Sequence, residues 1–198
     1  SLERLYLHQN DMWGFVPEEL SALTKMKTLI LRDNLFTYGI PNAVWDMTAM
    51  EVLDLGMNSF SSYIPVEISK MAHLSRLRLD NNDLTDYIPV DIGLLTSLIE
   101  IDLSYNKFSY LIPDEFSSLS AVTSLDLSNN LLSYDIPTSI GAMTSLVHLD
   151  LHSNTLSGWI VTDIVSLTKL TSLNLKSNVL SWPIPSEVGA LSNLLYMD

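Results

Sequence analysis

The 198-residue chain contains no cysteine, so it has no disulfide, no thiolate nucleophile and no cysteine-based zinc site. Basic residues are scarce: ten Lys and Arg stand against 23 Asp and Glu, and the formal charge of −13 would repel nucleic acid and anionic membranes. No apolar run approaches the roughly 20 residues that a membrane-spanning helix needs. The seven glycines show no phosphate-loop or dinucleotide-binding spacing. We therefore expect no nucleic-acid partner, no membrane span in this segment and no cofactor.

The main positive feature is a period of 24 residues. An asparagine recurs in register at positions 10, 34, 58, 82, 106, 130, 154 and 178. A leucine precedes each of them by three residues, and a leucine or isoleucine precedes each by five. Alternation such as Leu125 and Leu127 indicates a short strand with one buried face. The period predicts a single array over residues 1–198, with eight full repeats and the start of a ninth.

Each repeat also predicts a turn, a second strand and a helical segment. The repeated asparagine lies where the chain leaves the first strand, and its amide can satisfy turn backbone and form a ladder between coils. An Ile-Pro pair follows, such as Ile136-Pro137, and proline ends a strand because it cannot donate to the sheet. The spacing of Ile136, Ile140 and Met143 then indicates one or two turns of 3₁₀ or α-helix.

These residues resemble the plant-specific class of leucine-rich repeats, whose pattern runs LxxLxxLxLxxNxLSGxIPxxIGxLT. The match is nearly complete from Leu125 to Pro137, and the likeness covers all 198 residues. It implies an α/β solenoid: a right-handed superhelix with a parallel concave β-sheet, a short flanking second sheet and short 3₁₀ or α turns on the convex side. It also implies similarity to receptor-kinase ectodomains and polygalacturonase-inhibiting proteins, and hence an extracellular or cell-surface location.

The chain departs from this pattern in two ways. The glycine of the family's Ser-Gly-x-Ile-Pro segment survives only as Gly14 and Gly158. The caps with paired cysteines that are common in the family are missing, so each end exposes the apolar cross-section of a repeat. We expect the chain to be a fragment, or one link in a longer array.

Exposed strand positions should form columns across neighbouring coils. In one column Arg78 can pair with Asp54 or Asp102, and Asp102, Asp126 and Asp150 form a run that could hold a cation or a basic ligand group. Because aspartate here belongs to the family pattern and water can solvate each carboxylate, we predict no metal site.

The adjacent columns are irregular, as expected of a protein-recognition surface, although permissive surface positions would look the same. The candidate contacts on this concave face are Arg32, Asp54, Arg76, Arg78, Asp80, Asp102, Tyr105, Asp126, His148, Asp150, His152 and Lys176. Triad residue types meet around His148, but an open strand face offers neither oxyanion donors nor a dry pocket. We therefore predict that the protein is not an enzyme.

Aromatic residues precede the Ile-Pro pair, or its variant, in every repeat. We call this set the aromatic strip: Trp13, Phe15, Tyr38, Tyr63, Tyr87, Tyr110, Tyr134, Trp159 and Trp182. We expect a partly exposed ladder of stacked rings, and exposed aromatic surface indicates a partner site. The partner could be another copy of the solenoid or a carbohydrate. Alternatively, the rings only pack on each other between coils.

The combined interpretation is a scaffold that binds a protein or peptide on its concave face. A structural alternative is a self-assembling fibre or sheet protein, because an uncapped array with an aromatic strip can propagate contacts. Carbohydrate binding and ice binding are further alternatives. Ice binding calls for a flat, uniform Thr or Asn ladder, whereas the repeated Thr and Ser residues lie beside the helical turns.

Overall fold

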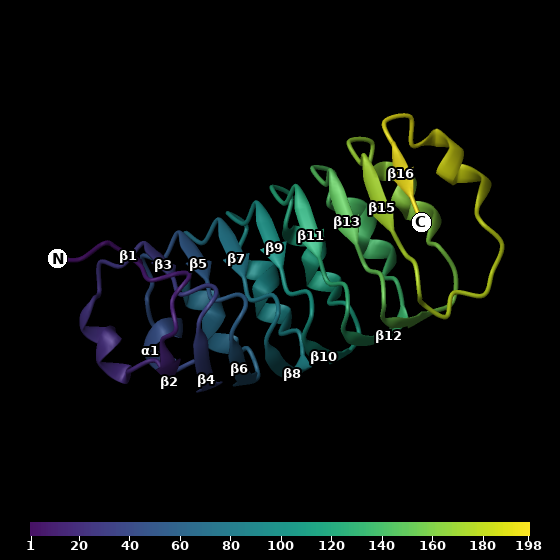
Figure 1. Ribbon diagram of the computed structural model, residues 1–198. Coiled ribbons are helices and arrows are strands. Elements are labelled where there is room, and N and C mark those ends of the chain that lie inside the picture. Colours follow the sequence, from purple (N-terminus) through teal and green to yellow (C-terminus); the bar gives the residue numbers. More distant parts are fainter.

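The computed structural model describes residues 1–198 as a stack of similar coils (Figure 1). The first strand of each coil joins a nine-stranded sheet in which neighbours are parallel. Its strands, in spatial order, are β1 (Arg4–Tyr6), β3 (Thr28–Ile30), β5 (Val52–Asp54), β7 (Arg76–Arg78), β9 (Glu100–Asp102), β11 (Ser124–Asp126), β13 (His148–Asp150), β15 (Ser172–Asn174) and β16 (Tyr196–Met197).

A second parallel sheet flanks the first and has seven strands. They are β2 (Trp13–Gly14), β4 (Leu35–Gly39), β6 (Ser59–Ser62), β8 (Asp83–Tyr87), β10 (Lys107–Tyr110), β12 (Leu131–Asp135) and β14 (Thr155–Ser157). The predicted second strand is therefore present in the first seven coils and absent from the eighth. In each of the seven it ends shortly before the Ile-Pro pair or its variant.

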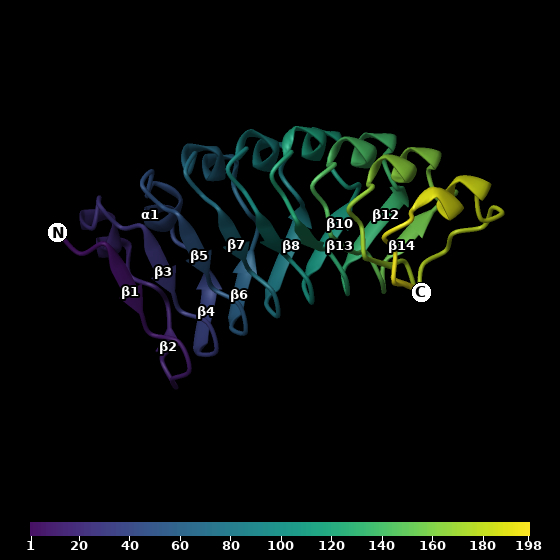
Figure 2. The same cartoon turned by 90° about the horizontal axis from the view of Figure 1, so that it is seen from above.

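Short helical turns complete the coils and line one side of the stack (Figure 2). They are η1 (Glu18–Ala22), α1 (Asn42–Trp45), η2 (Val66–Lys70), η3 (Val90–Leu94), η4 (Asp114–Ser118), η5 (Thr138–Ala142), η6 (Thr162–Ser166) and η7 (Ser186–Ala190). All but α1 are 3₁₀ turns, and all but η6 follow a proline in extended conformation. None of these turns has the length and apolar character needed to cross a membrane.

The core is one continuous column of apolar side chains between the strands and the turns. It contains 47 buried residues. Leu77, on a strand of the first sheet, and Leu103 and Leu151, directly after such strands, are fully buried, whereas Leu5 and Leu7 of the first coil are partly buried. Ile140 and Met143 close it from the helical side, as their spacing predicts. This arrangement is the predicted leucine-rich-repeat solenoid: a right-handed array with a parallel concave sheet, a short second sheet and helical turns on the convex side.

The two sheets have different registers. In the first sheet, residues 24 apart lie opposite each other, as in the pairs Ile101–Leu125 and Leu125–Leu149. In the second sheet the offset is 22, so Tyr110 lies opposite Leu132. Equivalent side chains therefore align in columns on the first sheet but are displaced by two residues per coil on the second.

The repeated asparagines form the predicted ladder. The amide of Asn106 donates to the carbonyl oxygens of Leu103 and Ser104 in its own coil and to that of Leu79 in the preceding coil, at 2.9–3.2 Å. Its oxygen accepts from the backbone N–H of Leu84 at 3.0 Å. One side chain thus satisfies the turn of its own coil and bonds it to the previous coil.

We expect Asn106→Ala to lower the free energy of unfolding by about 1–3 kcal/mol, because it leaves several buried backbone groups without partners. Asn10→Ala is the matched control, since Asn10 is exposed and bonds only within its own coil. We expect it to lose much less. Urea unfolding measures both, and equal losses would contradict a role for the inter-coil bonds.

Candidate functional site

The candidate contacts of the concave face lie on the strands of the first sheet or directly after them. Arg32, Asp80, His152 and Lys176 each follow a buried leucine, so their side chains point away from the core. Tyr105 occupies the turn position before the ladder asparagine and is 53% exposed. In neighbouring coils this turn position contacts the same face, because Asn81 donates to Asp80 at 2.9 Å.

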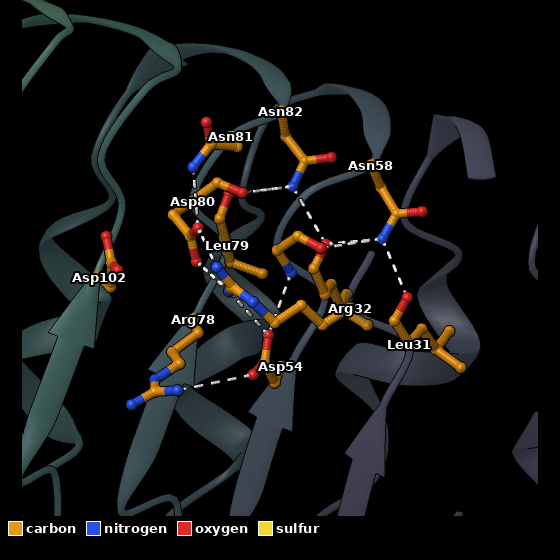
Figure 3. A network of polar contacts seen from close by, with 12 residues as sticks. Leu31, Arg32, Asp54, Asn58, Arg78, Leu79, Asp80, Asn81, Asn82 and Asp102 are labelled. Carbon is orange, nitrogen blue, oxygen red and sulfur yellow. Dashed lines mark hydrogen bonds and ion pairs between the residues drawn. The ribbon is translucent and has the colours of Figure 1, made fainter. Parts of the chain in front are cut away.

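Arg32 is the centre of a polar network that crosses three coils (Figure 3). Its guanidinium donates two hydrogen bonds to Asp80, at 2.6 and 2.8 Å, and lies 3.4 Å from an oxygen of Asp54. Burial would raise the pKa of Asp80, but the hydrogen bonds from Arg32 and Asn81 outweigh it and lower that pKa. The hydrogen bonds to Asp80 raise the pKa of Arg32, and this bidentate pair is fully charged at neutral pH.

Gly56 makes this long reach possible. Arg32 and Asp80 are 48 residues apart, two coils, and Gly56 occupies the corresponding position of the coil between them. A Cβ atom built on Gly56 would lie 2.5 Å from Oδ1 of Asp80 and closer still to Nη1 of Arg32. The sequence shows Gly56 only as one member of an irregular column, and its role depends on the path of the arginine side chain.

The other two arginines of this face bind Glu100. Nε of Arg78 donates to Glu100 at 2.8 Å, and Arg76 lies 3.5 Å from the same carboxylate. Arg78 also approaches Asp54, at 3.9 Å. The expected alternative pairing of Arg78 with Asp102 is wrong, because Glu100, on the adjacent strand β9, captures the guanidinium. Alignment of sequence positions into columns did not identify Glu100 as the partner of these arginines.

Asp102, Asp126 and Asp150 form what we call the acidic row, on the carboxyl-terminal part of the face. Burial raises the pKa of Asp102 to about 6, and the charges of Asp80 and Asp126 add to the shift while hydrogen bonds from Ser104 oppose it. Burial also raises the pKa of Asp126. No Lys or Arg lies within ion-pair distance of the row, and Asp102 stands apart from the Arg32 network in Figure 3. No three acidic or histidine side chains are close enough together to hold a metal ion.

The carboxyl-terminal end of the face carries two histidines and a lysine. Nδ1 of His152 lies 2.6 Å from Asp150, and Lys176 binds Asp198 at 3.1 Å. His148 is exposed and makes no hydrogen bond to the neighbouring serines or carboxylates, so the triad residue types do not form a hydrogen-bonded triad. The twelve candidate contacts thus occupy one face, with arginines in its first half and the acidic row in its second.

The aromatic strip is exposed, but its rings do not form the expected stacked ladder. The exposed fractions of these residues run from 45% for Trp159 to 82% for Trp13. The only pair of strip rings in contact is Trp159 and Trp182, edge to face with centroids 6.4 Å apart. The reason is the 22-residue register: Tyr110 lies opposite Leu132, and Tyr134 lies opposite Leu156. The alternative in which the rings only pack on each other is wrong for the same reason.

Several strip residues occupy strained backbone. At the position of the glycine in the resembled pattern, Gly14 and Gly158 have φ of 89° and 72°. Tyr38, Tyr110 and Tyr134 adopt φ of 67–70° there, and Ser62 and Asp86 adopt 84° and 73°. A non-glycine residue in this left-handed region costs roughly 1–2 kcal/mol. The family prefers glycine here because of this geometry, which the sequence pattern alone did not reveal.

Comparisons with known proteins agree with the repeat architecture described above. Family models described as leucine rich repeat match residues 92–132, 145–167 and 169–191. The solved structure of the plant peptide hormone receptor RGFR1 in complex with RGF2 is 36% identical, with a TM-score of 0.98, and the match covers 100% of this chain and 32% of that one. The chain is a leucine-rich-repeat protein.

Two further structures resemble this leucine-rich-repeat protein. The Arabidopsis receptor kinase HAESA, in complex with the peptide hormone IDA and the co-receptor SERK1, is 35% identical with a TM-score of 0.93, over 96% of this chain and 32% of that one. A plant ice-binding protein is 25% identical with a TM-score of 0.71, over 100% of this chain and 73% of that one. No curated protein sequence matches. The chain spans about a third of the length of the two receptor chains.

We expect Gly56→Ala to lower the free energy of unfolding of the leucine-rich-repeat protein by about 1–3 kcal/mol, because the methyl group displaces Arg32 from buried Asp80. Gly189→Ala is the control, since no atom lies within 4 Å of its added Cβ. In an Arg32→Ala background Gly56→Ala should cost far less. Urea unfolding of the four variants tests this, and an undiminished cost in that background would contradict it.

We expect Asp102→Asn to stabilise the protein at neutral pH. Between about pH 4 and pH 6 the folded state holds a proton on Asp102 that the unfolded state has released, so stability falls as pH rises through this range. Asparagine removes this loss and can still accept the bonds from Ser104. The variant should match the parent near pH 4 and exceed it by about 1–2 kcal/mol near pH 7.5, after allowance for partial exposure. Denaturant unfolding at both pH values measures the difference, and a gain of equal size at both would contradict this assignment.

Proposed function

We propose that the concave face binds an extended peptide, with a basic group of the peptide over the acidic row. RGFR1, a plant peptide hormone receptor, is in complex with RGF2, and HAESA is in complex with the peptide hormone IDA. These two structures match 96–100% of this chain at 35–36% identity. A solenoid of this kind presents a long surface of parallel strands on which successive peptide residues can contact successive coils. Because contacts are distributed over several coils, an extended peptide can bind this surface without a deep pocket.

The observation that carries this proposal is the uneven charge balance of the face. Arg32, Arg76 and Arg78 are neutralised by carboxylates of the protein itself. Asp102 and Asp126, in contrast, are partly buried and have raised pKa values without a Lys or Arg partner. Desolvated carboxylates without a cation cost stability, and such groups mark binding sites because a ligand can supply the missing charge.

The proposal describes a binding scaffold and not an enzyme. The face is an open sheet with an unpaired His148 and no enclosed pocket, so it offers little to exclude water from a reaction. Its similarity to receptor ectodomains favours an extracellular or cell-surface location for the protein that contains this chain. Recognition of the peptide then requires no cofactor.

Ice binding is the second candidate, favoured by the similarity to a plant ice-binding protein. The convex side carries an exposed row of hydroxyl residues, Thr24, Thr48, Thr96, Ser120, Thr144, Thr168 and Ser192. Ala72 interrupts the row, and the residues beside it belong to helical turns and not to a flat sheet. We favour peptide binding because the row lacks the uniformity that a lattice demands.

A displayed library of random 12-residue peptides, selected on the immobilised chain, tests the proposal. We expect the selected peptides to be enriched in Lys and Arg. Their affinity should fall at least tenfold for the double variant Asp102→Asn/Asp126→Asn, which corresponds to about 1.4 kcal/mol or more. Fluorescence anisotropy with the synthesised peptides gives the affinities.

The matched control is Asp91→Asn/Asp163→Asn, which removes two charges from the helical side. We expect this control to bind like the parent chain. Peptides without basic residues, equal losses in both double variants, or no enrichment at all would each overturn the proposal.

A further inference from the structure

The aromatic strip is a second exposed surface, separate from the concave face. It follows the second sheet along the flank of the stack, whereas the acidic row lies on the first sheet (Figure 2). Most of its rings are at least half exposed and only Trp159 and Trp182 touch each other. The faces of the rings are therefore available to a ligand.

Hollows separate the rings. One hollow of about 450 Å³ lies between Tyr87 and Tyr110, with Ile88 and Leu111 in its lining. A neighbouring hollow of about 430 Å³ shares Leu111 and is lined by Tyr134 and Trp159. Together they form a row over coils four to seven. Each has the volume of a small-molecule site.

Besides the tyrosine hydroxyls, the polar side chains in these hollows are three carboxylates and the hydroxyl of Thr138. Asp86 lines the first hollow, and Asp114 and Asp135 line the second, where they accept hydrogen bonds from Ser139 and Ser157 at 2.7 and 3.1 Å. Every carboxylate keeps acceptor sites free for further donors. No Lys or Arg lines either hollow. The surface therefore offers aromatic faces and hydrogen-bond acceptors, and no cation.

We propose that the aromatic strip binds a neutral polysaccharide with an extended chain, of the β-1,4-linked glucan type. The C–H faces of such sugar rings are apolar and stack on aromatic side chains, while their edges carry hydroxyl donors that suit Asp86, Asp114 and Asp135. A linear row of hollows requires a ligand that is itself linear and repetitive. The absence of a cation excludes anionic polysaccharides.

Charge and composition argue against a second copy of the chain as the occupant. Two copies would bring two surfaces lined by carboxylates together, and each chain carries a formal charge of −13. The rings are also separated by polar groups, whereas the centre of a protein interface is a continuous apolar patch. A sugar chain alternates apolar faces with hydroxyl edges and matches this surface better.

The backbone at Tyr110 and Tyr134 offers a substitution that tests the rings without loss of stability. Tyr110 and Tyr134 hold left-handed conformations that Gly158 adopts without strain at the same position of the repeat. Ser62 and Asp86 hold the same conformation at this position of their repeats, so the strain belongs to the turn and not to the rings. Glycine is thus a substitution that removes the ring and relieves the strain together.

Isothermal titration calorimetry with cellohexaose tests this proposal. We expect the parent chain to bind cellohexaose and the double variant Tyr110→Gly/Tyr134→Gly to bind at least tenfold more weakly, while its thermal midpoint is equal or higher. Tyr6→Ser, which removes an exposed ring outside the strip, should leave binding unchanged. Polygalacturonate, an anionic polymer, should not bind.

Three results would overturn the proposal: no heat from cellohexaose at millimolar concentration, equal affinity of parent and double variant, or tighter binding of polygalacturonate. Sedimentation of the parent as a dimer that the double variant abolishes would assign the strip to a second copy instead. The variant Asp102→Asn/Asp126→Asn should bind cellohexaose normally, so failure here is distinguishable from failure of the peptide-binding proposal.

Discussion

The side-chain amide of each buried asparagine joins two coils. Its nitrogen donates to the turn of its own coil and to a carbonyl oxygen of the preceding coil, and its oxygen accepts from a backbone N–H of that preceding coil. These backbone groups lie in the interior, where water cannot satisfy them. The chain therefore has to return to the same place every 24 residues, because an insertion before the asparagine would leave several buried groups without partners. The regular columns on the concave face are a consequence of this constraint.

The same constraint produces two different surfaces. The first sheet repeats every 24 residues, so side chains such as Asp102, Asp126 and Asp150 align and their charges interact. In the second sheet the offset is 22, so equivalent residues of neighbouring coils are two positions out of line. Side chains on the flank are therefore staggered, and hollows open between rings that a common period would have stacked.

The sequence predicts most of what depends on the repeat. The leucine spine, the asparagine ladder, both sheets and the helical turns follow from local spacing and from the requirement that buried backbone be satisfied. The failures concern long side chains and register. Arg78 binds Glu100 and not Asp102, a contact that depends on the rotamer of the arginine. Arg32 passes over Gly56 and binds Asp80, a contact that depends on the space left by the missing Cβ. The stacked aromatic ladder fails because a column of equal sequence positions is not a column in the second sheet.

Both proposed sites contain groups that cost stability, as other positions of the array do. Asp102 keeps a desolvated charge, and Tyr110 and Tyr134 keep left-handed backbone. Each feature weakens the fold. Hydrogen bonds from Ser104 offset part of the cost at Asp102, and no ring contact offsets it at Tyr110 or Tyr134. A solenoid tolerates such local costs because stability is approximately a sum over repeats and their interfaces, so one strained coil is supported by its neighbours. The repeated core thus allows the exposed positions to vary, and binding can use this freedom because a local cost in one coil does not unfold the array.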